Sequence, residues 1–298
     1  MMINAFSSIR FGLAQYPPIL PANHSPRFSA AKTLKEQISS PPVLEEHDGI
    51  TVARDDLTPG GTKVRALIKI FERPGVREVV YPSITCGGAQ LDRAVAAKAT
   101  GKKATILVPM RKDLHPRTLQ ALEAVGASAG DFRDAANGQR ILDSRYLKVI
   151  QVPHGFYTVV KKRAREYAEN AGALYLPPGA HAKETEIALA ETARQLEAEQ
   201  GPFDEVWCAA GSGTLSRALQ RGFKNPRTKF HAVEVAMPVD DLGRATVHRY
   251  ADKKLMQPLS KKPAPFPSDP HYDRKAWAIC QQAHGKGKIL FWNVLGDL

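Results

Sequence analysis

The sequence predicts an α/β fold with a mostly parallel sheet. Short apolar runs, most of them with β-branched or aromatic residues, alternate with stretches of helical character, as in repeated β-α units. The length of 298 residues allows one large domain or two modest ones. Hydrophobic residues make up 43% and charged residues 24%, as in ordinary globular proteins, so disorder and fibrous structure are not expected.

Each expected element follows from the local sequence. The apolar runs expected to be buried strands are residues 50–53, 78–81, 104–108, 173–176, 205–209, 230–235 and 289–294. The helices expected between them are residues 63–71, 90–100, 116–125, 159–171, 184–200 and 215–223. Residues 1–40, with scattered prolines, are expected to be an irregular arm, and residues 240–272 a long loop or a surface insertion.

Several protein classes do not fit this chain. No apolar stretch approaches the roughly 18 residues of a membrane span, and the N-terminus lacks the apolar core of a signal peptide. Cys86, Cys208 and Cys280 are odd in number and far apart, which fits neither a disulfide framework nor a zinc site. The histidines show no metal-binding spacing. We therefore expect a cytoplasmic protein with no metal and no membrane partner.

The chain is strongly basic, with a formal net charge of +12 and a pI near 9.6. Such a charge attracts polyanions, so a nucleic acid is a candidate partner, although a basic surface that only aids solubility is the alternative. Two basic stretches stand out, residues 161–165 and 248–262. The candidate nucleic-acid-binding residues are Lys161, Lys162, Arg163, Arg249, Lys253, Lys254, Lys261 and Lys262.

A glycine turn, Gly211, Ser212, Gly213 and Thr214, follows an expected strand and begins an expected helix. Backbone N–H groups, the two hydroxyls and the positive helix end can converge there on a phosphate. A plain tight turn is the alternative. The spacing matches neither the Walker loop nor the dinucleotide-binding fingerprint, which argues against nucleotide hydrolysis.

Two further loops carry candidate site residues. The first, residues 54–65, ends with Lys63 at an expected helix start, where partial desolvation would lower the pKa of the amine and make it an imine-forming nucleophile. A solvated surface lysine is the alternative. The second, residues 85–90, lies between a strand and a helix and offers free backbone N–H groups to a carboxylate.

The order of these three motifs resembles the fold-type II pyridoxal-phosphate (PLP) enzymes, the superfamily of the tryptophan synthase β-subunit and cysteine synthase. The likeness is greatest to its branch of aminocyclopropane-carboxylate (ACC) deaminase and D-cysteine desulfhydrase. It covers roughly residues 41–236 and returns at the C-terminus. The resemblance implies PLP as cofactor, an imine with Lys63, and a phosphate site at Gly211, Ser212, Gly213 and Thr214.

The resemblance also assigns the remaining candidate residues and shows departures from the family pattern. Thr85, Cys86, Gly87 and Gln90 would bind the substrate, and Tyr272 is a further candidate. Gly88 stands where the family has an asparagine at the cofactor ring, and Cys86 stands where it has a serine. The closing strand lacks the usual Ser or Thr at the pyridine nitrogen. Asn293 could substitute, although an ungapped match places Val294 there.

The family architecture implies two three-layer α/β domains with parallel sheets. We expect a smaller domain, residues 79–159, inserted into a larger one, residues 1–78 plus 160–298, with the cofactor in the cleft between them. A homodimer is also implied.

The resemblance further implies a lyase that acts at Cα or Cβ of an amino acid by elimination, deamination or decarboxylation. The family alone does not choose among these reactions. Together with the charge, it suggests a bacteriophage enzyme that decarboxylates an amino acid attached to thymine in DNA, in the cytoplasm of an infected cell. The alternative is a non-catalytic descendant of the fold that binds nucleic acid or a protein partner.

Overall fold

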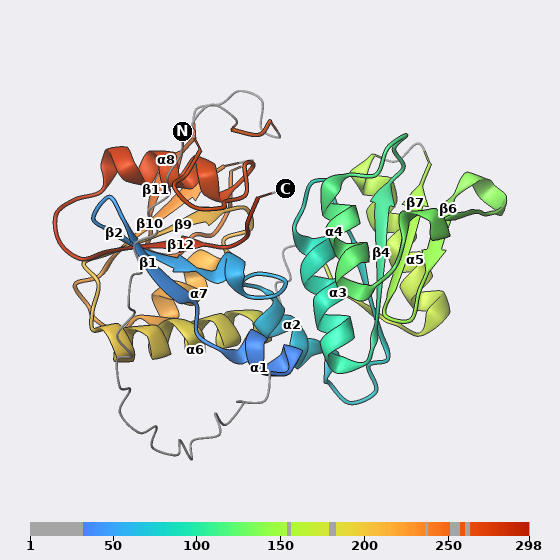
Figure 1. Cartoon of the computed structure of the whole chain (residues 1–298), viewed down its shortest axis with the longest axis horizontal. Coiled ribbons are helices and arrows are strands. Elements are labelled where there is room, and N and C mark those ends of the chain that lie inside the picture. Colours follow the sequence, from blue (N-terminus) through green and yellow to red (C-terminus); the bar gives the residue numbers. More distant parts are fainter. Residues whose placement is uncertain are drawn as a thin grey trace, which may run out of the picture. The chain divides into compact units, whose positions relative to one another are not determined.

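The computed structural model describes residues 32–153, 156–178, 183–235, 238–250, 257–259 and 263–297 (Figure 1). These residues form two six-stranded sheets with helices on both faces. The expected α/β class is therefore confirmed. No helix in the described ranges is long and apolar enough to cross a membrane.

The first sheet has the strand order β1-β2-β12-β9-β10-β11. Neighbouring strands are parallel except β1 and β2. The strands are β1 (Val43–His47), β2 (Ile50–Arg54), β9 (Glu205–Ala210), β10 (Lys229–Glu234), β11 (Thr246–Arg249) and β12 (Ile289–Asn293).

Alternation along the strands buries both faces of this sheet. Val206 and Cys208 belong to the core under α6 (Lys183–Gln200) and α7 (Thr214–Gly222). Trp207 belongs to the core on the other face, under α8 (Asp273–Ala283). Figure 1 shows α8 on one side of the sheet and α6 and α7 on the other.

The second sheet has the order β5-β6-β7-β4-β3-β8. Its strands β7, β4, β3 and β8 are parallel, and β5 and β6 are antiparallel additions at one edge. The strands are β3 (Glu78–Pro82), β4 (Lys103–Pro109), β5 (Arg133–Asp134), β6 (Arg140–Asp143), β7 (Leu147–Val152) and β8 (Leu174–Tyr175).

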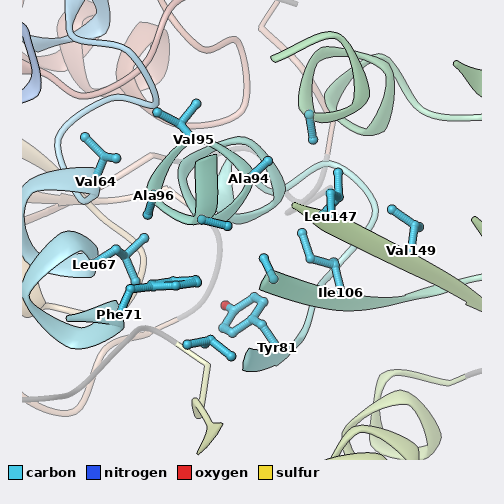
Figure 2. Packing of buried hydrophobic residues seen from close by; sticks show 14 of the residues in the cluster. Val64, Leu67, Phe71, Tyr81, Ala94, Val95, Ala96, Ile106, Leu147 and Val149 are labelled. Atoms are coloured by element: carbon cyan, nitrogen blue, oxygen red, sulfur yellow. The ribbon is translucent and has the colours of Figure 1, made fainter. Parts of the chain in front are cut away.

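Helices α3 (Ala89–Thr100) and α4 (Pro116–Val125) cover one face of the second sheet, and α5 (Tyr157–Ala171) covers the other. Helix α2 (Val64–Phe71) packs against α3 on the side away from the sheet, so one apolar cluster joins α2, α3 and the strands (Figure 2). The remaining short helices are α1 (Leu34–Ser39) and three 3-10 turns at Asp55–Leu57, Ala129–Asp131 and Ala136–Gly138.

The seven expected strands and six expected helices are all present, with ends within two residues of those expected. Two expectations were wrong. Helix α1 lies within the segment expected to be irregular, because Thr33 and Glu36 form a capping box that satisfies its first N–H groups. Strand β11 lies within the expected loop at 240–272, where it pairs with β10 at the edge of the first sheet.

The second sheet takes its strands from residues 78–175. Helix α5 and strand β8 pack with this sheet, although most of α5 and all of β8 lie beyond residue 159, where the expected inserted domain ends. The division into domains at residues 79 and 159 stays a prediction.

Candidate active site

A cavity of about 1180 Å³ lies at the carboxyl ends of parallel strands from both sheets. Its wall includes Ser83 after β3, Gly211 after β9 and Val294 after β12. Ligands in open α/β sheets bind at such strand ends. The wall also contains the residues immediately before or at the beginning of α2, α3, α7 and α8.

Lys63 is the N-cap of α2 and lines this cavity. The preceding loop is fixed to β12: the Thr62 N–H donates to the Val294 carbonyl at 3.3 Å, and the Trp292 indole N–H donates to the Thr62 hydroxyl at 3.1 Å. Burial lowers the pKa of the Lys63 amine, and this effect outweighs the opposing one of Asp92. A lowered pKa increases the neutral, nucleophilic fraction of the amine.

Gly211, Ser212 and Gly213 line the cavity next to the N-terminus of α7. Gly213 has φ +74°, and a Cβ there would lie 2.2 Å from the Asp241 carbonyl oxygen, so only glycine fits. The Ser212 and Thr214 hydroxyls lie 3.1 Å apart. Because the first turn of a helix directs N–H groups outward without intrahelical acceptors, the turn is suited to bind a phosphate.

The positive charge of Arg217 balances the negative charge of two carboxylates near this turn. Its Nε donates to Glu186 at 2.9 Å and lies 3.6 Å from the Asp241 carboxylate. Its Nη1 donates to the Asp241 carbonyl at 2.7 Å. The acidic residues at this end of the cavity therefore have a cation between them.

The loop before α3 lines the cavity with only part of the expected substrate-binding set. Gly87 and Gly88 line the cavity, whereas Thr85, Cys86 and Gln90 do not. The fully buried Gln90 amide donates to the Thr85 carbonyl at 2.9 Å and accepts from the Thr118 hydroxyl at 2.8 Å, so it holds the loop in place. Burial raises the pKa of the Cys86 thiol, which keeps the thiol neutral.

Leu295, in the C-terminal segment, packs directly against Gly88. A Cβ on Gly88 would lie 2.4 Å from Leu295 Cδ2. Leu295 itself lines the cavity. The absence of a side chain at position 88 therefore leaves room for the side chain of Leu295, which lies more than 200 residues later in the chain.

Asp273, which the sequence did not single out, is the most unusual acid of the cavity. It is fully buried, and its Oδ2 accepts from the Leu295 N–H at 3.2 Å, while its Oδ1 has no partner within the part of the chain the structure describes. Burial, assisted by Asp269, raises the pKa of this carboxyl well above its usual value. The only sequence signal is that Asp273 directly follows Tyr272 in the segment expected to contact substrate.

Asn293 lies outside the cavity wall. Its amide donates to Asp56 at 2.7 Å and to the Pro267 carbonyl at 2.9 Å. The structure thus brings Asp273, rather than Asn293, to the cavity. Tyr272 is also in the wall, and its ring packs on Gly211, where a Cβ would lie 3.0 Å from the Tyr272 Cε1.

Three more cavity residues were not expected. Asp92 forms an ion pair with Arg93 at 2.6 Å, and the Arg93 guanidinium lies 3.6 Å from the Tyr81 ring centroid. Tyr157, at the start of α5, donates from its hydroxyl to the Pro82 carbonyl at 3.1 Å. Asp92, Tyr81 and Tyr157 line the cavity.

The expected nucleic-acid-binding residues are only partly within the described ranges. Lys161, Lys162 and Arg163 lie on α5, where Lys162 and Arg163 share Glu166 at 3.8 and 3.2 Å. Arg249 forms an ion pair with Glu234 at 2.8 Å. Lys253, Lys254, Lys261 and Lys262 lie outside the described residues.

A phosphorylated aldehyde with a basic ring nitrogen fits the chemistry of these groups. The N-terminus of α7 suits its phosphate, the amine of Lys63 suits its carbonyl carbon, and the unpartnered Asp273 Oδ1 suits a nitrogen that carries a proton. The fold and cavity therefore define an α/β enzyme that uses a phosphorylated carbonyl cofactor.

Comparison with known families gives the same result. The model of the family described as "Pyridoxal-phosphate dependent enzyme" matches residues 37–287. The chain belongs to this family, and its cofactor is pyridoxal 5′-phosphate. A search of curated proteins found no significant match.

Solved structures share the fold at low sequence identity. An ACC deaminase homologue matches with a TM-score of 0.68 at 18% identity, covering 88% of this chain and 91% of that one. A hydrogen sulfide-producing enzyme from Fusobacterium nucleatum matches with a TM-score of 0.60 at 17% identity, covering 89% and 98%. An O-acetylserine dependent cystathionine β-synthase from Helicobacter pylori gives 0.59 at 17%, covering 89% and 95%. The expected fold-type II architecture is confirmed.

Proposed function

We propose that the protein is a PLP-dependent lyase that acts at Cα or Cβ of an amino acid, with Lys63 as the residue that carries the cofactor. The observation that carries this proposal is the amine of Lys63, with its lowered pKa, in the same cavity as the glycine turn before α7. PLP supplies an electron sink for the bonds at Cα of the substrate.

The residues of the chain would divide the work of binding and proton transfer. The turn at Gly211, Ser212 and Gly213 would hold the phosphate, and Asp273 would face the ring nitrogen. The amine of Lys63 is the group in the cavity that would take or give the proton at Cα. The Gly87 and Gly88 backbone would receive the substrate carboxylate.

The visible absorption spectrum tests this proposal. The parent protein with added PLP is expected to show a visible band that borohydride abolishes while fixing the cofactor to Lys63, as peptide mass analysis would show. Lys63→Ala should lose the band, and Lys69→Ala, an exposed lysine on the same helix, should keep it. A parent protein that gains no band would favour the alternative of a non-catalytic descendant that binds nucleic acid or a partner.

For the substrate, we propose an amino acid attached to a thymine base of DNA, from which the enzyme removes the carboxylate. The formal charge of +12 supports a polyanionic partner, and the cavity of about 1180 Å³ exceeds the roughly 300–1,000 Å³ common for small-molecule sites. Decarboxylation breaks the bond from Cα to the carboxylate, releases CO₂ and adds one proton at Cα. This role would suit a bacteriophage protein in the cytoplasm of an infected cell, and a homodimer is expected.

Product analysis distinguishes the possible reactions. An oligonucleotide that carries an amino acid on thymine should lose the mass of CO₂ on incubation with the PLP-loaded protein. Release of ammonia instead would indicate deamination or elimination. Turnover of free amino acids with no turnover of the oligonucleotide would refute the DNA-linked substrate while leaving the lyase proposal intact.

A further inference from the structure

The first turns of α5 expose an apolar surface. Phe156, the N-cap of the helix, is 82% exposed, and Val159, three residues later, is 36% exposed. Residues three and four apart share a helix face, so Lys162 and Arg163 extend the same face. These four residues, Phe156, Val159, Lys162 and Arg163, are called the α5 surface below.

The α5 surface adjoins the cavity through Tyr157. This residue directly follows Phe156, lines the cavity, and is fixed by the hydrogen bond from its hydroxyl to the Pro82 carbonyl at 3.1 Å. The Lys161 ammonium lies 5.4 Å from the centroid of the Tyr157 ring. A ligand on the α5 surface would therefore lie next to a residue of the cavity wall.

Positive charge on this side of α5 exceeds negative charge. Lys162 and Arg163 share the single carboxylate of Glu166. Lys161 has no carboxylate partner within the described ranges. An exposed aromatic ring beside surplus cations is the combination that binds single-stranded nucleic acid, since bases stack on the ring and phosphates pair with the cations. A second copy of this chain would bring the same positive charge, which disfavours it as the occupant.

We infer that the α5 surface binds single-stranded nucleic acid, with a base stacked on Phe156 next to the base whose substituent enters the cavity. The inference rests on the proposed DNA-linked substrate. It adds where the nucleic-acid strand that carries this substrate would bind. A base stacked inside a duplex cannot reach a cavity, and an exposed ring beside cations suits a single strand, so a single strand is the form in which the substrate is presented.

Binding of an unmodified oligonucleotide tests the inference without catalysis. The probe is a fluorescent single-stranded oligodeoxythymidine, and anisotropy is measured on the PLP-loaded protein at low salt. Phe156→Ala should weaken binding by on the order of 10-fold, as expected for loss of one stacked base. The double variant Lys162→Ala/Arg163→Ala should weaken binding and flatten the dependence on salt concentration, by about 0.7 in logarithmic slope for each lost phosphate contact.

Two exposed residues elsewhere provide matched controls. Val43→Ala removes a 53% exposed apolar side chain on β1, and Lys286→Ala removes an exposed cation before β12. Both variants should bind the oligonucleotide like the parent. Equal loss in these controls would indicate nonspecific attraction to the whole basic surface and would overturn the inference.

Further outcomes separate this inference from the proposed function. Unchanged binding in Phe156→Ala, or equally tight binding of the duplex, contradicts it. Sedimentation that shows dimers of the parent dissociating in Phe156→Ala would assign the surface to a second copy instead. The PLP band and the turnover of free amino acids are measured in the same variants, so unchanged oligonucleotide binding in the variants together with an intact band refutes only the inference.

Discussion

Asp273 carries a fully buried carboxyl whose pKa is raised well above the usual value by burial and by Asp269. Because the pKa is raised in the folded state, the folded protein holds this proton more tightly than the unfolded chain does. The resulting contribution to the free energy of unfolding is fully present below the ordinary pKa of 3.8 and is lost as the pH rises, so the ionisable acid costs stability at neutral pH. Asp273→Asn should therefore increase the free energy of unfolding of the cofactor-free protein at neutral pH by about 1 kcal/mol or more. The increase should vanish as the pH approaches 3.8.

Urea unfolding of the apoprotein at both pH values measures this effect, with Asp240→Asn, the same change at an exposed cavity residue, as control. A gain that is independent of pH would show that the carboxyl of Asp273 does not titrate as proposed. In the PLP-loaded protein the same variant should bind the cofactor more weakly, because the amide is a poorer partner for a protonated ring nitrogen than a carboxylate.

At the scale of single residues, the sequence predicted those candidate site residues that lie in a recognisable local motif. Lys63 and the Gly211 turn lie at junctions between a loop or strand and a helix, and these junctions are visible in the sequence. Asp92 and Asp273 gave no such signal, because an acid on a helix is normally solvated. Only the packing of distant segments places them in the cavity wall.

At the scale of elements, the turn before α7 depends on Gly213. Gly213→Ala adds the strain of a positive φ and a clash of the new Cβ with the Asp241 carbonyl oxygen, 2.2 Å away. Gly172→Ala, with φ +59° and nothing within 4 Å of the new Cβ, adds only the strain. We expect Gly172→Ala to cost about 1 kcal/mol of unfolding free energy. Gly213→Ala should cost clearly more and should also weaken PLP binding, as titration of the visible band would show. Equal costs in the two variants would contradict the proposed clash.

Apolar runs marked most of the central strands, because both faces of these strands are buried. The central strand β7 was missed, since Lys148 and Gln151 interrupt its apolar run although five of its six residues are buried. Other elements that were not expected have mixed patterns for physical reasons. Strands β1 and β11 lie at the edges of the first sheet and are mostly exposed or half-exposed. Helix α8 buries Asp273 and Lys275 beside Trp277, so its buried side does not form an apolar stripe.

At the scale of the whole molecule, Arg117 connects the helical layer of the second sheet with the cavity wall and the C-terminal segment. It lies in the first turn of α4, forms a buried ion pair with Asp269, and donates to the Gly296 carbonyl at 2.9 Å. Asp269 in turn accepts from the Tyr272 N–H at 3.2 Å. These partners lie more than 150 residues from Arg117, so no local pattern could predict the connection.

The pair of Arg117 and Asp269 should therefore control both stability and the integrity of the cavity. Arg117→Met keeps most of the side-chain volume but leaves a buried carboxylate unpaired, which we expect to cost about 3–5 kcal/mol of unfolding free energy. Arg117→Met/Asp269→Asn should recover much of this loss, and Arg133→Met, at an exposed arginine, should change little. Urea unfolding of the PLP-loaded protein measures all three variants.

The pH dependence of the Arg117→Met loss provides an independent check. Burial alone would raise the pKa of Asp269, but hydrogen bonds from His271 and the charge of Arg117 lower it overall. The stability that this lowered pKa provides is present above 3.8 and is lost as the pH falls through the folded-state value. Without Arg117, Asp269 can be protonated more easily, so the difference between parent and Arg117→Met should shrink in acid. A difference that stays constant down to acid pH, together with no recovery in the double variant, would mean that Arg117 stabilises the molecule through the Gly296 carbonyl and not through the charge of Asp269.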